Sequence, residues 1–144
     1  MKQNGHAPRY PLAESAGDAL RAASGRALSE IDLDAAAAGL LDAGDIQISA
    51  DTLRAQAEIA RQAGYRELAA NLARAAELTA VPNAELLRMY ELLRPGRSTY
   101  EELTGIAERL EGEYAAPLTA AFVREAAEVY RSRRLFRRDE ARLG

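Results

Sequence analysis

The stretch that decides the fold is STYEELTGIAERLEGEY, residues 98–114. Its apolar residues recur at the spacing i, i+3, i+4, i+7 and i+11, which is one face of an α-helix: Leu103, Ile106, Ala107, Leu110 and Tyr114. At the start of the stretch, Ser98 and Glu101 have the spacing of a capping box, in which each side chain satisfies a backbone N–H group of the helix terminus. The stretch therefore predicts an amphipathic helix.

Helices are also predicted on both sides of this stretch. The four that precede it are marked by capping or terminating residues: a short one from Asp32 to Leu41 that ends by Gly44, one that Ser49 begins and Gly64 ends, one over 66–78, and one over 84–93 that Asn83 caps after the break at Val81-Pro82. Pro117 suits the first turn of a final helix, because its missing N–H costs nothing there. We expect that helix to bury one face: Leu118, Ala121, Phe122, Val129 and Tyr130.

The composition predicts an all-α fold, an irregular array of roughly six short and medium helices. Val, Ile and Thr together number 13, while Ala, Leu, Glu and Arg dominate. Residues 1–27 are expected to form a flexible tail or to dock as one weak amphipathic helix, and 28–144 a single helical domain. The segment 45–49 alternates like a strand but is short, so an extended connector is expected. Since 32 of the 144 residues are Ala, the core gains little from burial, and a partner surface is expected to add stability.

Composition also excludes several kinds of site. The chain has no Cys and a single His, His6, which removes disulfides, thiolate metal ligands and a His-dependent catalytic triad. No apolar run approaches ~18 residues, so no membrane span is expected, and the N-terminus has no secretory pattern. A reducing cytoplasm is the expected location. Five carboxylates around one helix lack the Glu-x-x-His pairs of a di-metal site and indicate a solvated face: Glu101, Glu102, Glu108, Glu111 and Glu113.

The C-terminal end carries a dense positive charge. It contains six arginines and only two acidic residues, Asp139 and Glu140, although the whole chain has a net charge of −3. The six arginines are Arg131, Arg133, Arg134, Arg137, Arg138 and Arg142. They could bind an acidic protein or phosphates, since Arg forms bidentate pairs with both. They could equally be a solvated helix end whose cations oppose the negative pole of the helix dipole.

Several motifs taken together resemble one family, the small (gamma) subunit of adenosylcobalamin-dependent diol and glycerol dehydratases. The matching segments occur in the same order over about 28–138: ISADTLRAQAEIA (48–60), AAELTAVP (75–82), LRP (93–95) with Arg97-Ser98, and AAFVREAA (120–127). Tyr10-Pro11-Leu12-Ala13 also resembles an early motif of the family. Three positions depart from the family pattern, which usually has an acidic residue at Asn83, Tyr at Gly96 and an aromatic residue at Leu72.

The resemblance implies a non-catalytic role. In such enzymes two copies each of a large (alpha, barrel), a medium (beta) and a small subunit form a heterohexamer, a hydro-lyase that converts 1,2-propanediol or glycerol to an aldehyde plus water by radical chemistry. The adenosylcobalamin and the substrate are held by the other subunits. This chain is therefore expected to bind no cofactor or metal, to hold no catalytic residue, and to contact neither nucleic acid nor a membrane. The tail could direct the complex into a bacterial microcompartment.

Exposure and side-chain type suggest which residues contact the partner. They lie in the turn after the fourth predicted helix and at the arginine-rich end: Arg94, Arg97, Tyr100, Tyr130, Arg133, Arg134 and Arg137. The alternative function is a free-standing helical adaptor that binds an acidic protein or nucleic acid through the same arginine-rich end.

Overall fold

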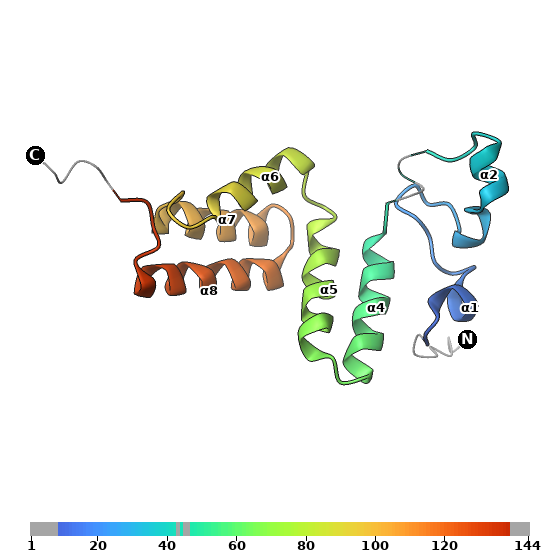
Figure 1. Cartoon of the computed structure of the whole chain (residues 1–144), viewed down its shortest axis with the longest axis horizontal. Helices are drawn as coiled ribbons and strands as arrows, with labels where there is room; N and C mark the ends of the chain where they lie inside the picture. Colours follow the sequence, from blue (N-terminus) through green and yellow to red (C-terminus); the bar gives the residue numbers. More distant parts are fainter. Residues whose placement is uncertain (1–8, 43, 45–46, 139–144) are drawn as a thin grey trace, which may run out of the picture. The chain divides into compact units, whose positions relative to one another are not determined.

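The fold is all-α in the computed structural model, which describes residues 9–42, 44 and 47–138. These residues form seven α-helices and one 3-10 helix, and no strand beyond an isolated bridge between Arg21 and Ala27. Figure 1 shows the helices in chain order. The predicted fold class is confirmed.

The chain divides into two compact units, Met1–Ala76 and Glu77–Gly144. Helix α5 (Arg66–Leu78) contains the point of division. The predicted boundary between residues 27 and 28 stays a prediction, and the two units are described one at a time.

The first unit is built around two helices joined by a tight turn. Helix α4 (Ala50–Gln62) begins where predicted, because the Ser49 side chain accepts a hydrogen bond from the N–H of Thr52. It ends at Gly64, whose φ of +87° favours glycine. Helix α5 has the predicted bounds. Figure 1 shows α4 and α5 side by side and antiparallel.

Three short helical elements precede α4 within the described residues: α1 (Leu12–Ala16), the 3-10 helix η1 (Leu28–Glu30) and α2 (Leu33–Ala37). Asp32 caps α2 as predicted, since its carboxylate accepts from the N–H of Ala35 at 2.7 Å. The prediction that this helix reaches Leu41 is wrong, because the chain leaves the helix at Gly39 with φ +68°. The expected connector at 45–49 includes residues 45 and 46, which lie outside the described residues.

The second unit is a three-helix arrangement of α6 (Asn83–Leu92), α7 (Tyr100–Gly112) and α8 (Pro117–Arg133). The predicted stripe of α7 is its core-facing side. The core consists mainly of α7 and α8 residues, with Val81, Met89 and Ala116: Leu103, Ile106, Ala107 and Leu110 of α7, and Ala120, Val123 and Ala127 of α8. Pro117 occupies the first turn of α8, as predicted.

Two predicted caps of this unit are wrong. The capping box of α7 uses Thr99 and Glu102, one residue later than predicted: Thr99 Oγ1 accepts from the N–H of Glu102, and the Glu102 carboxylate accepts from the N–H of Thr99 at 2.8 Å. Ser98 is instead buried, and its Oγ has no hydrogen-bond partner among the described residues. Asn83 is the first residue of α6, whose N-cap is Pro82.

The predicted buried face of α8 is also wrong. Leu118, Phe122 and Val129 are 54%, 48% and 38% exposed, and Ala121 is exposed as well. The buried face carries smaller side chains: Thr119, Ala120, Val123 and Ala127. Small residues let the backbones of α7 and α8 approach closely, so the larger apolar side chains point outward. Tyr130 is half-buried and packs against the core, as expected.

Candidate partner interface

The structure brings together the two segments that the sequence suggests as a partner interface. The turn after α6 pairs with the segment after α8 through backbone hydrogen bonds, from Gly96 N–H to Leu135 O at 2.7 Å and from Arg137 N–H to Ser98 O at 2.8 Å. The Arg137 guanidinium also donates to the carbonyl of Arg97 at 3.3 Å. All seven suggested residues therefore lie near this junction or in the elements that flank it.

An aromatic cluster holds the junction. Phe136 contacts the rings of Tyr100 and Tyr130 edge-on, with centroid separations of 6.0 and 5.9 Å. The Tyr130 hydroxyl donates to the carbonyl of Leu93 at the end of α6. Edge-to-face pairs of this kind add about 0.5–1.5 kcal/mol each beyond their burial. Sequence reasoning missed Phe136, which lies inside the arginine-rich segment, between Leu135 and Arg137, and is one of only two Phe in the chain.

Tyr100 also joins α7 to α8 through its hydroxyl. The hydroxyl donates to the Glu128 carboxylate at 2.7 Å, and the guanidinium of Arg131 lies 5.1 Å from the centre of the ring. The hydrogen bond to Glu128 raises the pKa of Tyr100, because the proton that would leave is the one shared with a carboxylate. Tyr100 and Tyr130 thus shape the junction, in addition to any contact that they make with a partner.

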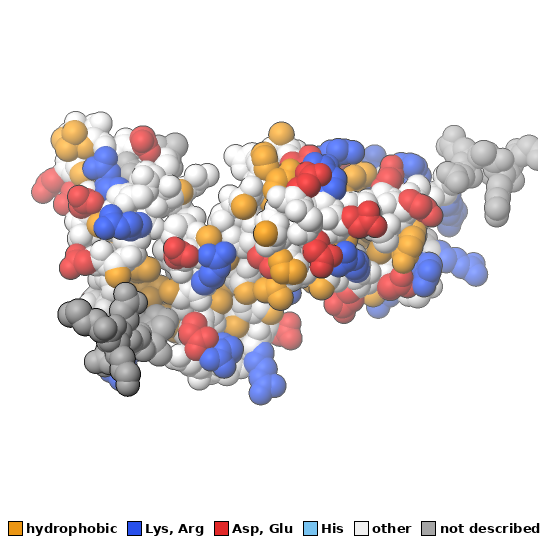
Figure 2. All heavy atoms as spheres, turned by 180° about the vertical axis from the view of Figure 1, so that it is seen from behind, with side chains coloured by type: hydrophobic (Ala, Val, Ile, Leu, Met, Phe, Trp, Pro, Cys, Tyr) orange, Lys and Arg blue, Asp and Glu red, His pale blue; other side chains and the backbone are white. Residues whose placement is uncertain are grey.

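The arginines of the junction fall into two groups. Arg94 and Arg97 pair with Glu91, at 3.1 and 3.4 Å, and Arg137 lies 3.6 Å from Glu102. These pairs are exposed and contribute little to stability. Arg133 and Arg134 are exposed, and within the described part of the chain neither forms an ion pair. Figure 2 shows blue Lys and Arg side chains gathered at the end of the second unit, on the right of the view.

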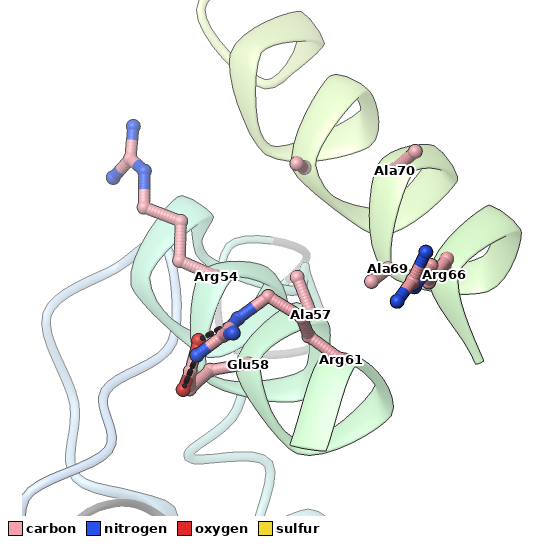
Figure 3. A pocket seen from close by; sticks show the side chains of 8 residues that line it. Arg54, Ala57, Glu58, Arg61, Arg66, Ala69 and Ala70 are labelled. Carbon is pink, nitrogen blue, oxygen red and sulfur yellow. Dashed lines mark hydrogen bonds and ion pairs between the residues drawn. The ribbon is translucent and has the colours of Figure 1, made fainter. Parts of the chain in front are cut away.

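Two grooves of the first unit involve the helices α4 and α5. An apolar one, of about 790 Å³, is lined by the Tyr10–Ala13 motif and by α4 and α5. The other, of about 580 Å³, is lined by alanines of α4 and α5 and by three arginines, Arg54, Arg61 and Arg66 (Figure 3). There Glu58 accepts two hydrogen bonds from Arg61, at 2.9 and 2.6 Å. Together with a third hydrogen bond, from Gln62, they lower the pKa of Glu58.

The described residues contain no group of three or more His, Cys, Asp or Glu side chains placed to hold a metal ion. None of their helices combines the length and the apolar character that a membrane crossing requires.

Fold and surface together define a class: a small all-α protein that exposes several large apolar side chains and a group of arginines on its surface. Comparison with known proteins gives the family. Residues 6–137 match the family model described as dehydratase small subunit. The chain is 45% identical over 131 residues to the propanediol dehydratase small subunits of Citrobacter freundii and of Salmonella typhimurium strain LT2, covering 91% of this chain and 76% of each relative. The chain belongs to the dehydratase small-subunit family.

Proposed function

We propose that this chain is the small subunit of an adenosylcobalamin-dependent propanediol or glycerol dehydratase, and that it assembles and stabilises the complex. A small subunit implies other subunits, which we take to be a large barrel subunit and a medium subunit. The observation that carries the proposal is the 45% identity to two propanediol dehydratase small subunits, which extends over 91% of the chain.

The division of labour in this proposal follows from the chemistry. Adenosylcobalamin supplies the radical that starts the conversion of a diol to an aldehyde plus water, and proteins bind and position such a cofactor. We assign the cofactor and the substrate to the other subunits, and to this chain only contacts with protein. The outward apolar side chains of α8, Leu118, Phe122 and Val129, support a role in subunit contact, because surfaces that bind proteins expose such residues.

The test is co-expression of the cognate large and medium subunits with and without this chain. After addition of adenosylcobalamin and 1,2-propanediol or glycerol, aldehyde formation is measured, and the amount of soluble complex is determined by size-exclusion chromatography. We expect the complex and its activity to fall sharply without this chain. Full activity of the other two subunits alone would contradict the assembly role, and aldehyde formation by this chain alone would contradict the non-catalytic one.

Stoichiometry and location are further parts of the proposal. Two copies of each subunit would give a heterohexamer, which light scattering of the purified complex would reveal. Encapsulation in a bacterial microcompartment is tested by fusing residues 1–26 to a fluorescent reporter in shell-forming cells. Punctate fluorescence is the expected result, and a diffuse signal would contradict it. The same tail with Leu12→Glu and Leu20→Glu is the control, because these changes remove both of its leucines.

A further inference from the structure

One end of the second unit concentrates positive charge from two separate parts of the sequence. We call it the cationic end and define it by six residues: Arg94, Arg97, Arg133, Arg134, Arg137 and Arg138. The backbone hydrogen bonds Gly96–Leu135 and Arg137–Ser98 bring the two segments together. The cationic end is thus a product of the fold and not merely a run of arginines at a helix terminus.

The positive charge of the cationic end is only partly compensated. Glu91 pairs with Arg94 and Arg97, and Glu102 pairs with Arg137. The other three arginines are exposed, and no ion pair joins them to any residue that the structure describes: Arg133, Arg134 and Arg138. An unmatched cluster of guanidinium groups attracts carboxylates or phosphates, with which Arg forms bidentate hydrogen bonds.

The backbone that carries these arginines is held in place. Arg134 ends α8 in the left-handed conformation with φ 55°, and its N–H and that of Leu135 both bond back to the last turn of α8. Phe136 is then fixed between Tyr100 and Tyr130. Binding groups on a preorganised segment lose less conformational entropy when a partner docks.

The cationic end continues an exposed apolar stripe. Leu118, Phe122 and Val129 lie on the outward face of α8, and Arg133 follows Val129 at the i+4 spacing that places two residues on one helix face. Protein interfaces combine an apolar centre with a polar rim, and Arg is enriched in them. A second copy docked through the same surface, as in a symmetric dimer, would bring like charges together and is a poor occupant. Nucleic acid would engage the arginines through phosphates but would leave the apolar stripe uncovered.

We infer that the cationic end and the outward stripe of α8 form the docking surface for a partner protein that presents carboxylates beside an apolar patch. The identity of the partner rests on the proposed function, under which it is the large subunit, alone or together with the medium subunit.

The test uses the full chain with two charge reversals, R133E/R138E. Both side chains are exposed and form no ion pair with described residues, so the change alters charge without breaking an ion pair of the described part of the chain. The matched control is R66E/R88E, which changes the net charge equally at two exposed helical arginines elsewhere in the chain. Binding of each variant to the co-expressed large and medium subunits is measured by biolayer interferometry at two salt concentrations, after circular dichroism has shown that the helix content is unchanged.

We expect R133E/R138E to bind about tenfold more weakly or worse, because reversed charges now face the partner's carboxylates. The control should bind like the wild type, and added salt should weaken binding of the wild type more than binding of R133E/R138E.

Equal binding of R133E/R138E and the wild type would overturn the inference and leave the proposed function intact. The same holds if the control weakens binding as much as R133E/R138E does. A wild type that fails to bind the other subunits would contradict both. Salt-sensitive binding of a DNA duplex that R133E/R138E loses, without loss of subunit binding, would assign the arginines to nucleic acid instead.

Discussion

Glu77 and Thr119 are joined by two hydrogen bonds. Glu77 Oε2 accepts from the Thr119 N–H at 2.7 Å and from the Thr119 hydroxyl at 2.6 Å, while its Oε1 accepts from the N–H of Leu118 at 2.9 Å. The N-cap position of α8 is Ala116, whose side chain cannot accept a hydrogen bond. The last turn of α5 therefore supplies the cap that the local sequence of α8 lacks, and a negative charge there also suits the helix dipole.

Removing this carboxylate should destabilise the second unit. Because Glu77→Ala leaves the first N–H groups of α8 unpaired, we expect it to lower the free energy of unfolding by about 2 kcal/mol, the sum of a lost cap and a lost charged hydrogen bond. Urea denaturation followed by circular dichroism measures the change. Glu108→Ala is the control, since Glu108 is an exposed residue of α7 and such a change is usually within about 0.5 kcal/mol. Equal midpoints for the two variants would show that Glu77 does not cap α8.

The neighbouring residues Ser98 and Thr99 should respond in opposite ways to substitution. Thr99→Ala removes the N-cap of α7 and should cost about 1 kcal/mol. Ser98→Ala removes a buried hydroxyl that has no partner among the described residues, so stability should stay the same or rise. Thermal unfolding of the two variants measures both changes in stability. If Ser98→Ala were the more destabilising change, the capping box would lie one residue earlier than the structure places it.

The aromatic cluster should protect the segment after α8 from proteolysis. Phe136→Ala removes the ring that contacts Tyr100 and Tyr130. Local opening should then make the backbone at the arginines after α8 accessible to trypsin, and we expect cleavage there to become at least about threefold faster. Mass spectrometry of a digestion time course locates and times the cuts. Phe136→Leu retains most of the apolar volume and should be cut more slowly than Phe136→Ala; indistinguishable rates for the wild type and both variants would mean that the cluster does not hold the segment.

Two glycines of the second unit should also differ in their response. Gly105 lies inside α7 with open space where a Cβ would be, so Gly105→Ala should stabilise by about 0.5–1 kcal/mol through helix propensity. Gly96 has φ +79°, a conformation that L-residues adopt at a cost, and Gly96→Ala should destabilise by about 1 kcal/mol. The melting temperatures of both variants, compared with that of the wild type, test these two predictions. A stabilising Gly96→Ala would contradict the left-handed turn that carries the Gly96–Leu135 hydrogen bond.

Local sequence patterns predict most of this fold. The bounds of α5 and the caps of α2 and α4 follow from residues within a few positions of each helix end, and the α7 stripe follows from its spacing. The α7 cap is ambiguous in sequence, because Ser98 with Glu101 and Thr99 with Glu102 have the same spacing. The two overlapping alternatives differ only in which hydroxyl is exposed at the helix terminus, which depends on the fold around it.

The errors arise where residues distant in sequence decide the outcome. The sequence of α8 predicts that its large apolar residues are buried, but the close packing against α7 selects the alanine-rich face. Glu77 caps a helix 42 residues away, and no local pattern indicates such a pairing. The sequence suggests a set of residues for the candidate interface, and their contact with a partner stays a prediction. The role of Phe136 could not be predicted from local sequence, because its ring contacts join the end of α8 to the start of α7.

The link from Glu77 to Thr119 determines where the chain can be cut. A fragment designed to isolate the last three helices would naturally start at Asn83, the first residue of α6. Such a truncation would discard the carboxylate on which the opening turn of α8 depends. An expression boundary placed upstream of Glu77, within the preceding helix, would retain it.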